Sequence, residues 1–87
     1  MVEKIKFINT TDKTIEILIE PEAEYISLLP GKTILIVLKK ITDDYEDELT
    51  FELEMDMLII YESRQCDMQI FIDDELKYFT TPGRVRI

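Results

Sequence analysis

Leu29-Pro-Gly-Lys-Thr-Ile-Leu-Ile-Val-Leu38 is the stretch that decides the fold class. Pro30 and Gly31 occupy the two central positions of a predicted type II turn, because glycine adopts the positive φ of the third turn position at little cost. The residues that follow, 33–38, are apolar and largely β-branched, which favours a strand in the middle of a sheet, covered on both faces. We expect the turn to join this strand, as a hairpin, to a short strand over residues 25–29.

Alternation of apolar and polar residues extends the prediction towards the N-terminus. Residues 4–7 and 14–20 both show it, with isoleucines and Phe7 on the inward positions and Glu16 and Glu20 among the outward ones. Each stretch is therefore predicted to be a half-buried strand. The turn formers between them predict a hairpin in which Lys6 faces Glu16 across the strands.

The second half of the chain shows the same alternation. In residues 49–56, the inward positions are Leu49, Phe51, Leu53 and Met55, and the outward positions are Thr50, Glu52, Glu54 and Asp56. Residues 57–61 predict another strand, and residues 62–67 a polar turn. The last hairpin is expected to run over 68–72 and 76–79, with its turn at Asp73-Asp-Glu75.

These strands define the fold class. Seven or eight short strands are expected at about ten-residue spacing, and no window of ten or more residues shows a helical stripe. With 87 residues the chain has room for one core, so residues 1–87 are expected to form one domain. We predict an all-β protein: a single antiparallel β-sandwich or a partly open barrel.

The charge of the chain is placed unevenly. Nineteen acidic and ten basic residues give a net charge of −9, which argues against a nucleic-acid or anionic-membrane partner. Acidic and basic residues balance in residues 1–40 and again in residues 64–87. Residues 41–63 contain nine acidic residues and no lysine or arginine, so the whole net charge belongs to this stretch. A basic protein partner suits such a chain.

Few residues are available for catalysis or metal binding. Without histidine there is no Ser-His-Asp triad, no Cys-His pair and no imidazole ligand for a metal. Cys66 has no second cysteine beside it, and the two glycines stand apart from any phosphate-binding loop. Paired carboxylates remain the one catalytic option, but they need a cleft. We therefore predict a non-enzymatic protein with no metal or cofactor.

The same residues indicate the compartment. A single cysteine cannot form an intramolecular disulfide, which favours a reducing cytosol. The N-terminus shows no signal peptide, and the longest apolar runs have five residues, too few to span a bilayer. We expect a soluble cytoplasmic protein.

One resemblance accompanies this interpretation. Phe7-Ile-Asn-Thr-Thr-Asp12, Ile15-Glu-Ile-Leu-Ile-Glu-Pro21 and Leu28-Leu-Pro-Gly31 resemble the opening of small bacterial β-sandwich proteins without an assigned function. A similar pattern opens the β domain of the von Hippel-Lindau protein, and the resemblance covers about residues 5–38. The hydroxyproline pocket of that domain needs tryptophan and histidine, which this chain lacks, so its function does not carry over.

The acidic stretch is the candidate binding site. Its residues are Asp43, Asp44, Tyr45, Glu46, Asp47 and Glu48, expected in a loop, with Glu52, Glu54 and Asp56 on the adjacent strand. Tyr45 is either an interface anchor or a cover for the end of the sandwich. The leading hypothesis is a bacterial immunity protein that neutralises a basic, nuclease-type toxin. A structural domain that self-associates through sheet edges is the second, and a carboxylate enzyme or calcium-binding module the third.

Overall fold

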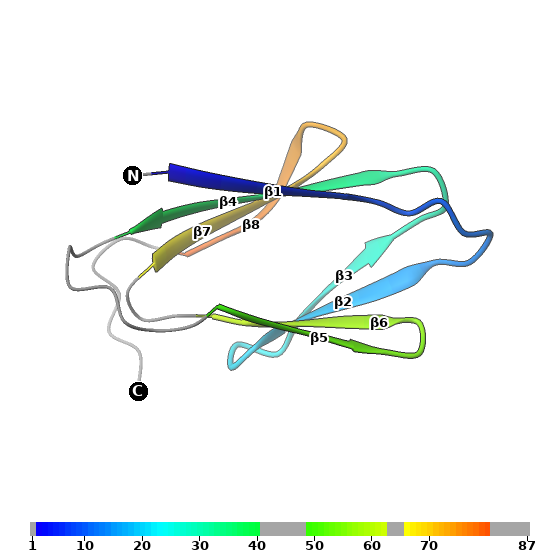
Figure 1. The fold of residues 1–87 in the computed structure, drawn as a ribbon, viewed down its shortest axis with the longest axis horizontal. Coiled ribbons are helices and arrows are strands. Elements are labelled where there is room, and N and C mark those ends of the chain that lie inside the picture. Colours follow the sequence, from blue (N-terminus) through cyan, green and yellow to red (C-terminus); the bar gives the residue numbers. More distant parts are fainter. Residues whose placement is uncertain (1, 41–48, 63–65, 81–87) are drawn as a thin grey trace.

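The computed structural model describes residues 2–40, 49–62 and 66–80, and these residues form eight β-strands and no helix. The strands are β1 (Val2–Ile8), β2 (Ile15–Glu20), β3 (Glu24–Leu28), β4 (Thr33–Lys40), β5 (Thr50–Glu54), β6 (Met57–Tyr61), β7 (Cys66–Ile72) and β8 (Glu75–Phe79). Sheet A has the order β1-β4-β7-β8 and sheet B the order β3-β2-β6-β5, and the two sheets form two layers (Figure 1). The predicted all-β sandwich is confirmed.

The core lies between the two sheets and consists mostly of isoleucine. Period-two alternation turns every second residue of β2, β4 and β7 inwards, and β-branched side chains pack well on a pleated surface. The buried cluster comprises Ile17, Ile19, Leu28, Ile34, Ile36, Leu38, Ile60, Met68, Ile70 and Ile72. Among the described residues, no helix is long and apolar enough to cross a membrane.

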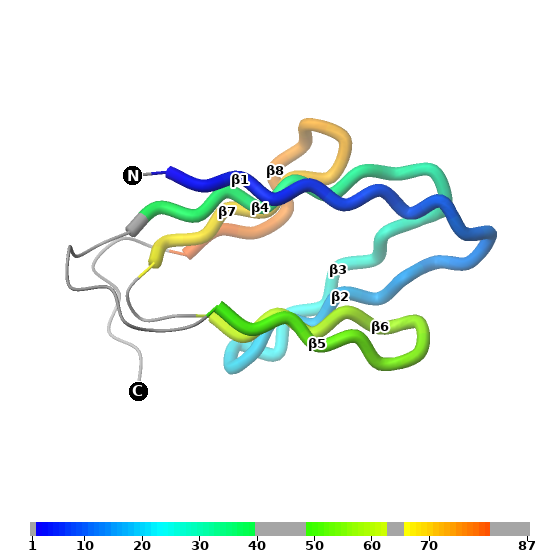
Figure 2. Tube along the Cα trace, in the orientation of Figure 1, coloured from blue at the N-terminus to red at the C-terminus, as the bar shows by residue number. Residues whose placement is uncertain are grey.

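The first two strands lie in different sheets, so the predicted β1–β2 hairpin is wrong. β1 pairs with β4, and β2 pairs with β3 and β6. Lys6 is therefore opposite Leu35 rather than Glu16. The link between β1 and β2 crosses from one layer to the other, at the right-hand end of the tube in Figure 2.

Asn9 explains why this link crosses between the sheets. Its side chain is buried, and Nδ2 donates hydrogen bonds to the carbonyl oxygens of Lys13 (2.8 Å) and Leu28 (2.9 Å). Its Oδ1 accepts hydrogen bonds from the backbone N–H of Thr11 at 3.0 Å and from the Thr11 hydroxyl at 2.6 Å. The link is thus fastened to the end of β3 instead of returning along β1.

The turn at residues 29–32 forms as predicted but does not make a hairpin. Lys32 N–H donates to the Leu29 carbonyl at 3.1 Å, and Gly31 has a φ of 80°. The strands on either side lie in different sheets, since β3 pairs with β2 whereas β4 pairs with β1 and β7. Gly31 N–H also donates to the Asn9 carbonyl at 2.7 Å, so both sheet crossings are joined at one end of the sandwich.

Three further details differ from the sequence-based expectations. The pairing of β2 with β6 is parallel, while the other strand pairs are antiparallel. β4 is central as predicted, but only its inward face is fully buried, because a sandwich covers each sheet on one side. β7 begins at Cys66, which is buried, so Cys66 and Asp67 belong to a strand and not to the polar turn predicted for residues 62–67.

The edge strand β5 is less buried than its alternation predicts. Phe51 packs against the core, but Leu53 is 75% exposed and Met55 is 93% exposed. Met55 lies beyond the end of β5, in the turn before β6, where its φ is 54°. An edge strand has a neighbour on one side only, which leaves its end open to solvent.

The sandwich is open on the side between β1 and β5, because these edge strands are not hydrogen-bonded to each other. Phe7 of β1 and Phe51 of β5 meet there edge to face, with ring centroids 6.0 Å apart. This contact joins the two layers through side chains alone. The architecture is therefore a sandwich, the first of the two predicted alternatives.

Candidate functional site

Charged residues are sorted between the two sheets. The strands of sheet B contain acidic residues at Glu16, Glu20, Glu24, Glu52 and Glu54 and no lysine or arginine. The strands of sheet A contain Lys4, Lys6, Lys39, Lys40 and Lys77 against Glu3, Asp67 and Glu75. The formal charge of the strands is therefore −5 in sheet B and +2 in sheet A.

The outer side of sheet B gathers most of these glutamates around an apolar strip. Leu18 lies opposite both Tyr25 of β3 and Ile59 of β6, and Ile59 lies opposite Glu52 of β5. Ile59 is only 8% exposed although it points away from the core. We call this side the acidic face; its residues are Glu16, Leu18, Glu20, Tyr25, Ser27, Thr50, Glu52, Glu54, Met57, Ile59 and Tyr61.

Side-chain hydrogen bonds hold two of the carboxylates in place. The hydroxyl of Ser27 lies 3.0 and 3.1 Å from the two carboxylate oxygens of Glu16, which is its cross-strand neighbour. The hydroxyl of Tyr61 donates to Oε1 of Glu52 at 3.3 Å. Both bonds leave acceptor capacity on the carboxylates, since an ionised carboxylate accepts about four hydrogen bonds.

The pKa of Tyr61 responds to desolvation and to the carboxylates around its hydroxyl. Its pKa is raised above the ordinary tyrosine value by desolvation and then by the charge of Glu52 and the hydrogen bond to it. Glu20 and Glu54 raise the pKa further by their charge. Carboxylates from two different strands thus act on one hydroxyl, because the parallel pairing of β2 with β6 places Glu20 opposite Tyr61.

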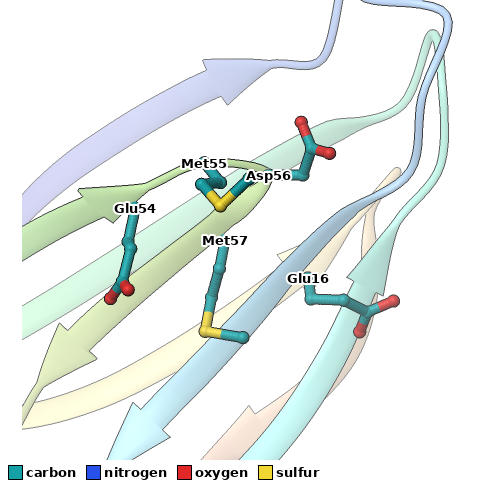
Figure 3. A pocket seen from close by; sticks show the side chains of 5 residues that line it. All are labelled: Glu16, Glu54, Met55, Asp56 and Met57. Atoms are coloured by element: carbon teal, nitrogen blue, oxygen red, sulfur yellow. The ribbon is translucent and has the colours of Figure 1, made fainter.

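A shallow pocket of about 360 Å³ lies at the end of this face, lined by Glu16, Glu54, Met55, Asp56 and Met57. Met57 stands between Glu16 of β2 and Glu54 of β5 in the strand register, and Figure 3 shows its thioether between their two carboxylates. A lysine or arginine side chain has an apolar stem and a cationic head. The Met57 thioether suits the apolar stem, and the carboxylates of Glu16 and Glu54 suit the cationic head.

In residues 2–40, 49–62 and 66–80, no group of three acidic or cysteine side chains is placed to hold a metal ion. The free thiol of Cys66 is buried in β7.

The structure brings together part of the predicted site and adds residues to it. Glu52 and Glu54 lie on the acidic face, and Asp56 lies at its end in the β5–β6 turn. The predicted loop residues Asp43, Asp44, Tyr45, Glu46, Asp47 and Glu48 lie outside the described residues. Glu16, Glu20, Tyr25, Met57 and Tyr61 are members of the face that sequence reasoning did not assign to it.

The outward positions of Glu16 and Glu20 were a usable signal for this extension. Their segment has balanced charge, and the expected β1–β2 hairpin paired Glu16 with Lys6. In the structure, β1 with its lysines and β2 with its glutamates lie in opposite sheets. The charge balance of residues 1–40 therefore does not hold on either face. Because the strand pairing was predicted wrongly, the contribution of Glu16 and Glu20 to the acidic face was missed.

Comparison with protein-family models, with curated proteins and with solved structures finds no match for this chain.

Proposed function

We propose that this protein is a non-catalytic binding protein whose acidic face receives a basic protein partner. The observation that carries the proposal is the sorting of charge: the four strands of sheet B contain five glutamates and no cation. A solvated surface needs charge only for solubility, and mixed signs serve that purpose well. On sheet B all the strand charges are negative, and they surround tyrosine and methionine side chains. This arrangement matches a surface that attracts a cationic partner.

The composition of the face supports protein binding rather than simple solvation. Tyr25 is 61% exposed and Tyr61 is 38% exposed, so both rings are available for contact. Tyrosine and methionine are enriched at protein interfaces, and tyrosine is common among the residues that dominate binding energy. The surrounding carboxylates would speed association, since complementary charge raises the rate constant by steering the encounter.

The most concrete form of the proposal is a bacterial immunity protein that covers the basic active site of a nuclease-type toxin. Such an active site binds phosphates, and carboxylates presented on a rigid sheet are a protein equivalent of a row of phosphates. The loop residues Asp43, Asp44, Tyr45, Glu46, Asp47 and Glu48 would extend the same interface. A cytosolic location, with Cys66 kept reduced, belongs to this proposal.

Co-expression with the product of the neighbouring gene tests the proposal. The neighbour alone should arrest growth, and the wild-type protein should relieve the arrest. The variant Glu16→Gln/Glu20→Gln/Glu52→Gln/Glu54→Gln should fold but fail to protect. The matched control Glu3→Gln/Asp12→Asn/Asp74→Asn/Glu75→Gln removes the same charge elsewhere and should protect like the wild type.

Two results would contradict different parts of the proposal. Full protection by the four-glutamine variant would show that the acidic face is not the interface. A neighbour that neither arrests growth nor binds the protein would reject the immunity role. Neutralising the loop acids Asp43, Asp44, Glu46, Asp47 and Glu48 in a third variant measures their share of the interface by the same assay.

A further inference from the structure

The outer side of sheet A is a second unpartnered surface, with the opposite charge. Cross-strand register places Lys4, Val37, Gln69 and Phe79 in one row across the sheet, and Lys6, Leu35, Phe71 and Leu76 in the next. Phe79 is 55% exposed and Leu76 is 44% exposed. We call these two rows the lysine face.

The two lysines of this face make no ion pair with another described residue. The ion pairs between described residues are Lys32 with Asp73 and Lys77 with Glu75, and neither involves Lys4 or Lys6. Their cross-strand neighbours Val37 and Leu35 are apolar. Lys6 also lines a pocket with Asp73 and Asp74, and the Asp73 carboxylate is already paired with Lys32. Lys39, at the far end of β4, has Asp67 opposite it and adds little charge to the face.

The lysine face and the acidic face are complementary in both charge and apolar content. Each has an apolar strip across its middle strands: Leu35, Val37 and Phe71 in one, and Leu18 and Ile59 in the other. In the acidic face the charges bordering the strip are glutamates, and in the lysine face they are Lys4 and Lys6 along the β1 edge. Sheets commonly stack face to face at about 10 Å through strips of this kind.

We infer that the lysine face docks onto the acidic face of a second copy of this chain, so that Lys4 and Lys6 of one copy meet the glutamates of the other. Charge complementarity decides the occupant, because the same chain carries both halves of the contact. The net charge of −9 opposes association in general. At physiological salt the Debye length is about 8 Å, so charges in contact attract while those farther away are screened.

The geometry determines the kind of oligomer. The two faces lie on opposite sides of the sandwich (Figure 1). Each copy therefore contacts one neighbour through its acidic face and another neighbour through its lysine face. Such a heterologous contact does not close by two-fold symmetry and adds copies in series. The contact also occupies the acidic face, so the inference rests on the surface of the proposed function, and a basic partner would displace the second copy.

Sedimentation velocity over a range of concentrations tests the inference. The wild type should form species that grow beyond the dimer with concentration at about 0.15 M salt. Association should weaken at least about tenfold at about 1 M salt, where the Debye length is about 3 Å. Lys4→Gln/Lys6→Gln and Glu16→Gln/Glu52→Gln should each remain monomeric. The control Lys13→Gln/Lys77→Gln, which changes lysines outside the two rows, should associate like the wild type.

Mixing the two neutralised variants gives the sharper result. Each variant keeps one intact face, so an equimolar mixture should form a dimer that cannot grow. A wild type that stays monomeric at all concentrations would overturn the inference, as would a wild type that stops at the dimer, which indicates a two-fold contact. The proposed function is tested separately. Lys4→Gln/Lys6→Gln leaves the acidic face intact, so this variant should still protect against the basic partner.

Discussion

Asn9 shows how one buried polar side chain decides the course of the chain. It is 1% exposed and satisfies two carbonyl groups and one backbone N–H through its own side chain. Replacing it with alanine removes these three hydrogen bonds at a sheet crossing, and the Lys13 carbonyl keeps only its bond from the Thr11 hydroxyl. We expect Asn9→Ala to lower the free energy of unfolding by about 2–4 kcal/mol in urea denaturation.

A matched change on its neighbour separates this role from general loop damage. Thr11→Ala removes one hydroxyl that bonds to Asn9 but keeps the amide of Asn9 in place, so a loss of about 0.5–1.5 kcal/mol is expected. Equal losses for the two variants would show that the Asn9 side chain has no special role in the crossing.

Asp73 makes a titratable contribution to stability at the β7–β8 turn. Its Oδ1 accepts a hydrogen bond from the Thr33 backbone N–H at 3.0 Å, and its Oδ2 is 3.1 Å from Nζ of Lys32. The Thr33 bond first, and then Lys32, hold the pKa of Asp73 below the ordinary aspartate value. The folded state therefore binds this proton less tightly than the unfolded state. The contribution is present above about pH 4 and is lost as the pH falls through the lower, folded-state pKa.

Thermal melting across acidic pH checks this linkage. Asp73→Asn keeps an acceptor oxygen and tolerates the positive φ of 47°. This variant should lose less stability than the wild type as the pH falls below about 4. Asp74→Asn, in the same turn, leaves the Thr33 and Lys32 contacts in place and should follow the wild-type profile. Identical acid profiles for wild type and Asp73→Asn would contradict the assignment.

At the scale of the element, the β5–β6 turn carries avoidable strain. Met55 has a φ of 54° and is 93% exposed, so its side chain stabilises nothing by burial while its backbone is in the left-handed region. Met55→Gly should raise the free energy of unfolding by about 0.5–1 kcal/mol. Asp56→Gly, at the next position, where φ is not positive, should lower it. A loss of stability in Met55→Gly would show that the side chain contributes in a way its exposure does not reveal.

The elements also show what could be predicted from sequence and what could not. Alternation and short apolar, β-branched runs identified the eight strands to within a few residues, because burial of one sheet face imposes a period of two and central strands are more apolar. Strand partners were not predictable, since the turn formers at residues 9–13 and 29–32 specify a reversal but not the sheet to which the chain returns. Contacts between Asn9, Leu28 and Gly31 make that choice, and no local pattern contains them.

The same limit applied to the candidate site. Glu52, Glu54 and Asp56 were predicted from an acidic ladder on one strand, expected over residues 49–56, and in the structure Asp56 lies in the turn after β5. Glu16, Glu20 and Tyr25 joined them only through the parallel β2–β6 pair and the β2–β3 hairpin, which depend on the three-dimensional fold.

At the scale of the whole molecule, the acidic face should make stability depend on salt. Like charges on one sheet repel, and unfolding separates them. Raising the salt concentration from about 0.01 M to about 0.15 M shortens the Debye length from about 30 Å to about 8 Å, so the melting temperature should rise. Calorimetry at low protein concentration tests this, and Glu52→Gln should reduce the salt effect more than Glu3→Gln. A melting temperature unaffected by salt would mean that the carboxylates do not repel appreciably.

The sorting of lysines and glutamates by sheet also gives the described strands a separation of charge, and so a dipole, across the two layers. A dipole experiences a torque in the field of an approaching charged body, so the molecule would rotate before it touches anything. Near a positively charged surface the acidic side turns forwards, and near a negatively charged one it turns away. The charge sorting of the strands thus favours one orientation during diffusion, before any contact is made.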